Sequence, residues 1–477
     1  MKKALATILA LVMALGLTTA AWADGCSGGE SCTHQAAIGS THYNTLAEAI
    51  TAASDGDTIV LQDNATTDTL QDGITYDLNG YKLTYSGSTH VVGVGKTLTF
   101  MDSSVTGNAR GGTLELSGVT GTTAAINPQR GATLKVSNIK VTCRGSAFFP
   151  QGDAAEVDVT ACDVTAPIYC VGTNAGSTDN YKVVIKLKDS TFVAAADDGD
   201  NCAVMINVPG TLNIDNCTIT GDRQAVIVRA GTAVITNSDI KTTGKFTGAA
   251  TKYHSDAWKS GNEVPAAALT VGNYQNGPAS AYLAEAEVTV TNTKLTAENG
   301  VPAIYTDAND TYKGDLTIGG DSTVVTGEVM KGQKADKAVV AVTGGTFSSD
   351  VSAYAPEGTP VAMVGNDYAV GSSAISAAAN GGKTVIVVKA GPINGVDAGK
   401  SITVNRGVTG VTVNGVPVTG GSYTVPARYY YNSTTTDTKT TDTKGSPKTF
   451  DAGIALYVGM ALTSAAGVAF VGKKRED

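Results

Sequence analysis

A short pattern repeats along residues 44–350 and restricts the possible folds more than any other feature of the chain. Each copy runs apolar, any residue, apolar, two further residues, a small residue, any residue and a final apolar residue. The first apolar residues of the copies stand at positions 134, 157, 185, 212, 233, 288, 316 and 340. Most steps are 21–28 residues. The step of 55 residues fits either two repeats or one repeat with an insertion over about 241–284.

The pattern predicts short strands with one buried face, because side chains alternate along a strand. A second apolar run follows in most copies, so each repeat offers two or three strands. One coil cannot bury its inner face alone, whereas stacked coils bury a continuous core. Repeats of this length favour an all-β parallel β-helix, or solenoid, over a propeller, which needs longer four-stranded repeats.

A solenoid must cover its open ends. Residues 45–53 predict a short capping helix with Asn44 or Thr45 as the N-cap. Residues 374–387 repeat residues 49–61 with one extra residue. We therefore predict a second, small β module over 351–426, opened by a similar helix. Chance similarity in an Ala-rich chain is the alternative.

The N-terminal residues 1–23 predict a secretory signal peptide, because a basic start and an apolar run precede Ala21-Trp22-Ala23. An uncleaved membrane helix and a lipoprotein signal are the alternatives. Residues 24–43 form an N-terminal segment before the solenoid. Export would place the folded part outside the cell.

The C-terminal part predicts a tether. Residues 427–447 form a Thr-rich linker, and residues 448–477 an anchor. Residues 452–472 carry no charge and precede Lys473-Lys474-Arg475. A transmembrane helix with a cytoplasmic C-terminus is expected. A buried globular helix explains the apolar run but not the basic end.

Residues 43–50, 55–61 and 74–80 together resemble the start of the pectate-lyase-like right-handed β-helices, in particular the adhesin-type surface proteins of Gram-positive bacteria. Residues 342–350 are similar to a segment that ends coils in those proteins. The resemblance implies a right-handed β-helix at the cell surface, and it implies no particular activity.

Residues Ser446, Pro447, Lys448 and Thr449 resemble a divergent sortase sorting signal, since an apolar span and a basic tail follow. The resemblance implies that a sortase cuts after Thr449 and links the chain to the cell wall. Ser446 replaces the usual Leu and Phe450 the usual Gly. A retained membrane anchor is therefore the alternative.

No catalytic residue can be assigned from the family. Its lyases need a base with Ca²⁺ or Arg, and its hydrolases need two or three carboxylates. The arginines from 110 to 229 lie outside the Arg-x-Pro-x-x-Arg motif of the lyases, and the Gly-His-Gly of the hydrolases is absent.

Two segments outside the repeat could bind ligands. The 241–284 insertion contains aromatic side chains that could stack on sugar rings: Tyr253, Trp258, Tyr274 and Tyr282. Packing of the insertion against the solenoid is the alternative. Asp197, Asp198 and Asp200 could bind Ca²⁺ in a flexible acidic loop, and a solvated turn is the alternative.

The cysteines divide into two groups. Cys26 and Cys32 could form a disulfide outside the cell. Cys162 and Cys217 share one position of the repeat but stand two coils apart, roughly 10 Å, which is too far for a disulfide. We predict that they are small buried residues.

The net charge of −9 argues against binding nucleic acid through a basic face. From the predicted export, anchor and solenoid together we expect a non-catalytic cell-surface protein that serves adhesion or binds a ligand, such as a host or environmental glycan or a surface protein. A polysaccharide lyase or glycoside hydrolase, and a passive structural spacer, are the alternatives.

Overall fold

The computed structural model describes residues 34–173, 182–195, 201–244, 266–272, 284–308, 312–332 and 337–427. They belong to one compact unit that ends at Ala427. The predicted signal peptide, nearly all of the linker and the whole anchor lie outside the described residues. Within the ranges given above, no helix is long and apolar enough to cross a membrane.

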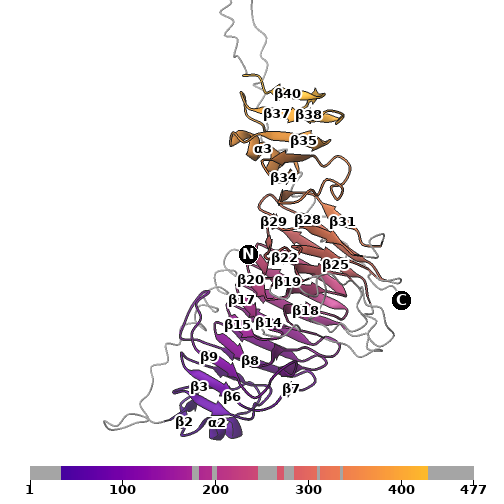
Figure 1. Cartoon of the computed structure of the whole chain (residues 1–477). Helices are drawn as coiled ribbons and strands as arrows, with labels where there is room; N and C mark the ends of the chain where they lie inside the picture. The colour runs from indigo at the N-terminus through magenta and orange to yellow at the C-terminus, as the bar shows by residue number, and fades with distance from the viewer. Residues whose placement is uncertain are drawn as a thin grey trace, which may run out of the picture. The chain divides into compact units, whose positions relative to one another are not determined.

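The described chain is all-β apart from two short helices, and its long parallel sheets are consistent with a β-helix (Figure 1). The largely parallel sheet A contains, in spatial order, β2 (Thr41–Tyr43), β1 (Ala36–Ile38), β3 (Thr58–Leu61), β5 (Thr75–Asp77), β8 (Thr97–Met101), β11 (Thr133–Ser137), β14 (Glu156–Thr160), β16 (Val183–Lys188), β19 (Gly210–Asp215), β22 (Gly231–Thr236), β25 (Ala286–Thr291), β28 (Gly314–Gly319) and β31 (Val340–Val342).

Sheet B receives the next strand of each coil. Its solenoid part contains β4 (Ala65–Thr67), β6 (Lys82–Tyr85), β9 (Thr113–Leu116), β12 (Lys140–Cys143), β15 (Asp163–Ala166), β17 (Thr191–Ala194), β20 (Thr218–Gly221), β23 (Asp239–Thr242), β26 (Lys294–Ala297), β29 (Val324–Thr326) and β32 (Gly345–Phe347).

Sheet C completes the coils in two blocks. The first contains β7 (His90–Val92), β10 (Ala124–Pro128) and β13 (Ser146–Phe148). The second contains β18 (Cys202–Ile206), β21 (Gln224–Val228), β24 (Ala267–Val271), β27 (Ile304–Thr306) and β30 (Val329–Lys331). Single bridges at Val171 join the two blocks, and residues 168–170 just before it form no strand.

The register confirms the repeat found in the sequence. Leu134, Val157, Ile185 and Leu212 are direct neighbours on successive strands of sheet A, and all are buried. The remaining first apolar positions continue the same column to Val340. Stacking the coils therefore buries each inner face against the same core.

The 55-residue step is one coil with an insertion, because β22 pairs directly with β25. The predicted insertion is not continuous, however. Residues 267–271 within it form β24, which pairs with β21 and β27 in sheet C. Every internal gap in the described chain borders the sheet C part of a coil.

A hydrogen-bonded column runs through the turns between sheets A and B. Its side chains are thiols or hydroxyls, and each accepts a backbone N–H from the coil before it. Thus Cys217 N donates to Ser238 Oγ (3.0 Å), and Ser238 N donates to Thr293 Oγ1 (3.3 Å). Cys162 and Ser190 continue the column. The preceding turn residue adopts positive φ, as Asn216 and Asn237 do, which Asn tolerates better than most residues.

The helix α2 (Leu46–Ala52) covers the first coil, as predicted. Thr45 is the N-cap, and it forms a capping box with Glu48. Leu46, Ala49 and Ile50 are buried in the solenoid core. The end of the solenoid is thereby shielded from water.

The second helix predicted from the internal repeat is also present, as α3 (Ser372–Asn380). It follows the hairpin of β33 (Val361–Val364) and β34 (Asp367–Val370), and β35 (Val385–Lys389) comes after it. β33 pairs antiparallel with both β34 and β35, just as β1 pairs with β2 and β3. The module thus repeats the opening of the solenoid.

The module ends with β36 (Pro392–Ile393), β37 (Ser401–Val404), β38 (Val411–Val413), β39 (Val416–Val418) and β40 (Gly421–Thr424). Sheet B continues into it through the pairing of β32 with β34. The β33–β34 hairpin separates two cores. Val361 and Val370 pack into the solenoid core, whereas Ala362 and Ala369 pack into the core of the module.

Candidate ligand-binding site

The side chains predicted to bind ligand lie outside the described residues. This holds for Tyr253, Trp258, Tyr274 and Tyr282, for Asp197, Asp198 and Asp200, for Cys26 and Cys32, and for Ser446, Pro447, Lys448 and Thr449. Their predicted roles therefore stay predictions.

The buried cysteines behave as the spacing predicts. Cys162 and Cys217 are free and buried at the same turn position, two coils apart. They are more than fillers, because each thiol donates to the carbonyl two residues before it (both 3.3 Å). Burial raises the pKa of Cys162 to about 12 and that of Cys217 to about 11.

An open pocket of about 550 Å³ lies where the chain enters sheet A. We call it the edge pocket. It spans the first residues of four neighbouring strands, β16, β19, β22 and β25, together with the residues just before them. Its lining is Lys182, Val183, Val184, Pro209, Gly210, Thr211, Gly231, Thr232, Ala284, Glu285 and Glu287.

Two stacked glycines form the floor of the edge pocket. A Cβ on Gly210 would lie 2.2 Å from Val183 O, and one on Gly231 would lie 2.5 Å from Gly210 O. Both residues also adopt positive φ, at +147° and +81°. Only glycine allows this close approach of the strands, so the floor is smooth backbone.

Hydroxyl groups stand above this floor. Thr211 and Thr232 are exposed and pair directly in the ladder, so their side chains repeat at the strand spacing of about 4.8 Å. Such a row can hydrogen-bond a ligand that has a similar repeat.

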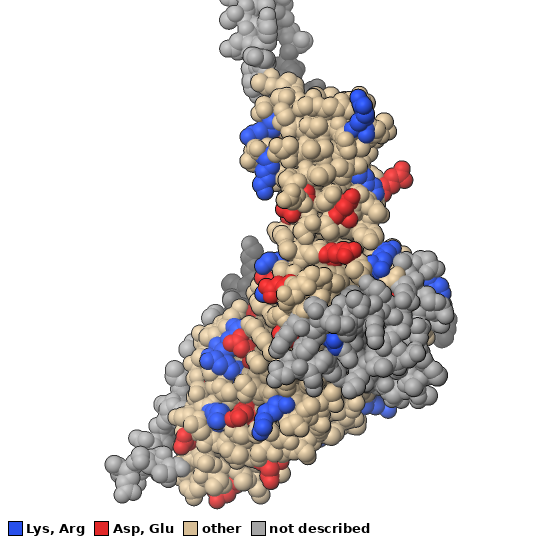
Figure 2. Space-filling model, in the orientation of Figure 1, with Lys and Arg blue, Asp and Glu red and all other residues tan. Residues whose placement is uncertain are grey.

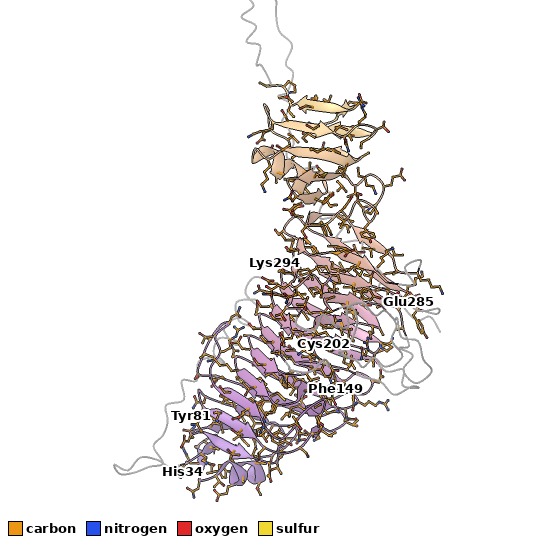
Figure 3. The ribbon with its side chains drawn as sticks, in the orientation of Figure 1. His34, Tyr81, Phe149, Cys202, Glu285 and Lys294 are labelled. Carbon is orange, nitrogen blue, oxygen red and sulfur yellow. The ribbon has the colours of Figure 1, made fainter. Side chains whose placement is uncertain are left out.

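Charges stand at opposite ends of the edge pocket. Lys182 precedes β16, and Glu285 and Glu287 flank Ala286 at the start of β25. All three are exposed, and none has an ion-pair partner within the described part of the chain. Figure 3 shows Glu285 at the side of the stack, well apart from Lys294 on sheet B.

The charges next to the pocket and on sheet B are paired instead. Lys186 Nζ lies 2.6 Å from Glu156 Oε1, and this hydrogen bond raises the pKa of Lys186. On sheet B, Lys82 Nζ lies 3.0 Å from Glu115 Oε2 and lowers the pKa of Glu115. Acidic and basic side chains are also interspersed on the face in Figure 2. Such pairs leave little charge for a ligand.

A buried polar row lies across the turn from the edge pocket, at the carboxyl ends of the sheet C strands. Asn207 N donates to Thr173 Oγ1 (2.7 Å), and Arg229 N donates to Ile206 O (2.9 Å). Asp307 follows two coils later and accepts the Tyr305 hydroxyl (2.8 Å). The side-chain amide of Asn207 is fully buried and has no hydrogen-bond partner among the described residues.

The outer face of sheet C carries a separate apolar cluster. Ile168, Tyr169, Cys202, Met205 and Ile227 form it, and Phe149 packs against it. Figure 3 shows Phe149 and Cys202 away from the edge of the stack where Glu285 lies. The cluster explains why β18 and β21 are buried on both faces.

Among the described residues, no group of three His, Cys, Asp or Glu side chains could hold a metal ion. Lys182 and Glu285 are far apart in the sequence, so spacing alone did not reveal the edge pocket. The one available signal is a glycine at the start of successive strands.

Comparisons with protein-family models, with curated proteins and with solved structures found no match to this chain.

Proposed function

We propose that the chain is a non-catalytic cell-surface protein whose coils hold an extended glycan in the edge pocket. In this proposal the signal peptide exports the chain, the coils wind as a right-handed β-helix, and residues 448–477 attach it to the cell wall or the membrane.

The observation that carries the proposal is the open pocket across four strands. Its volume lies in the range of ligand sites. Two hydroxyl groups, those of Thr211 and Thr232, lie about one strand spacing of 4.8 Å apart above its floor, where they can hydrogen-bond the hydroxyl groups of a sugar chain. Exposed hydroxyls and carboxylates also suit the many hydroxyl groups of a glycan.

The test is a binding and depolymerisation screen with the full chain, kept in solution by detergent. Thr211→Trp fills the pocket, and Thr165→Trp places the same side chain on exposed sheet B. We expect binding to at least one polysaccharide, weakened about tenfold or more by Thr211→Trp alone. Release of unsaturated uronides or of shortened chains would instead identify an enzyme.

A passive spacer is the second candidate, because many charged side chains of sheet B form ion pairs with one another and are then not available to a ligand. Lys294 lies 3.3 Å from Asp239, and Lys241 lies 2.7 Å from Glu298. Absence of binding to every polysaccharide and surface protein in the screen would favour the spacer.

A further inference from the structure

The charge around the edge pocket selects among glycans, if the proposed function holds. Glu285 immediately precedes β25 and Glu287 is the second residue of that strand. Both side chains are exposed, and their spacing of two residues places them on the same outer face. Glu287 pairs directly with Asp315 on β28, and the carbonyl of Lys313, just before β28, accepts the Ala286 N–H (3.1 Å). Glu285, Glu287 and Asp315 therefore place three carboxylates at the start of two neighbouring strands, with the exposed Lys313 beside them.

The adjacent carboxylates of Glu287 and Asp315 cost the sheet stability, because like charges on neighbouring strands repel. Neither has an ion-pair partner among the described residues, although Asp315 accepts the Val339 N–H (3.3 Å). A positively charged group in the pocket would relieve this repulsion. The single amine of Lys182 lies three strands away, about 14 Å along the stack, and cannot supply it.

We infer that the edge pocket takes an extended oligosaccharide with free amino groups, which place their charge beside Glu285 and Glu287 in the pocket lining, one strand from Asp315. A calcium ion fits less well, since it needs six to eight oxygen ligands and the described carboxylates do not converge as a metal site.

A peptide also fits less well. Addition of a peptide strand needs an unpaired sheet edge, whereas the backbone N–H groups in the floor of the edge pocket already form hydrogen bonds. Val183 N donates to Pro209 O (3.1 Å), and Gly231 N donates to Glu285 O (2.8 Å). A glycan needs only the side chains that stand above this floor.

The experiment compares three hexasaccharide probes on the full chain in mildly acidic buffer: β-1,4-glucosamine, its N-acetylated form and a uronate. The glucosamine probe should bind about tenfold or more tightly than the other two, and added salt should weaken its binding. The double variant Glu285→Gln and Glu287→Gln should lose this preference, because both probes then meet uncharged amides. Glu357→Gln, at an exposed site outside the pocket, is the matched control and should leave the affinities of all three probes unchanged.

Equal binding of the amine and N-acetylated probes, or a preference for the uronate, would overturn the inference and leave glycan binding in place. If no probe binds, and no polysaccharide in the wider screen does, both the inference and the proposed function fail. The thermal midpoint of each variant shows that a loss of binding is not a loss of folding.

Discussion

Ser238→Ala should destabilise the stack of coils although it removes a single oxygen atom. Ser238 Oγ accepts the N–H of Cys217 (3.0 Å) from the coil before it and donates to Thr236 O (2.7 Å). Cys217 is only 2% exposed, so water cannot replace the lost acceptor. The substitution leaves one buried N–H without a partner.

The structure limits the loss to that one group. Thr236 O keeps a second donor, Asn216 N at 3.1 Å, so the carbonyl stays satisfied. An orphaned buried donor costs about 1–3 kcal/mol, and the missing oxygen adds little cavity volume. Ser238→Cys should cost less than half as much, because Cys162 and Cys217 already serve as acceptors at this position.

Urea unfolding of the full chain measures the stability of both variants. The midpoints report stability where the variants share the same dependence of the free energy of unfolding on urea concentration. Ser422→Ala, at an exposed hydroxyl in β40, is the control and should stay within about 0.5 kcal/mol of the parent. If Ser238→Ala matches this control, or if Ser238→Cys is as damaging as Ser238→Ala, the hydrogen-bonded column does not stabilise the fold.

Three further outcomes follow from the same coils. Iodoacetamide should label Cys162 and Cys217 only after unfolding in urea, because both are buried and their pKa values are raised; mass spectrometry that finds native labelling would contradict this. Hydrogen bonds from Asn237 and Thr236 lower the pKa of Asp215. The contribution of ionised Asp215 to the stability of the fold is therefore complete above the ordinary Asp pKa of about 3.9 and is lost as the pH falls through the lowered value. Asp215→Asn should therefore lower the urea midpoint at neutral pH and much less in strong acid; an equal loss at both would refute the linkage. Asn207→Leu should raise the free energy of unfolding by up to about 1 kcal/mol, and a lower free energy of unfolding would reveal a partner for the buried amide.

The sequence was most informative where neighbours in space repeat the same position of the coil. Leu134 and Val157 are recognisable in the sequence and adjacent in sheet A because stacking converts a repeat into a register. The capping helices were equally accessible, since the N-cap of α2 and the apolar face of α3 are local patterns.

The sequence was less informative about the small residue of the repeat. The repeat predicted Cys162 and Cys217 only as small buried residues, whereas the structure shows that they also donate and accept hydrogen bonds. Only Ser, Thr and Cys are small enough and able to do both. The preference for Ser, Thr or Cys at this position is visible in the sequence. Its cause, a backbone N–H donated from the neighbouring coil, is a tertiary contact that the sequence does not show.

By itself, the sequence determined an all-β chain of stacked coils, the helix that covers its start, and a second small β module over residues 351–426 that begins with a similar helix. Each of these rests on periodicity or capping, which act over a few residues. The tertiary structure alone decided that the β33–β34 hairpin divides two cores and that Lys182 and Glu285 border one pocket. Insertions of different length separate these residues in the chain, and only the strand register brings them to the same edge.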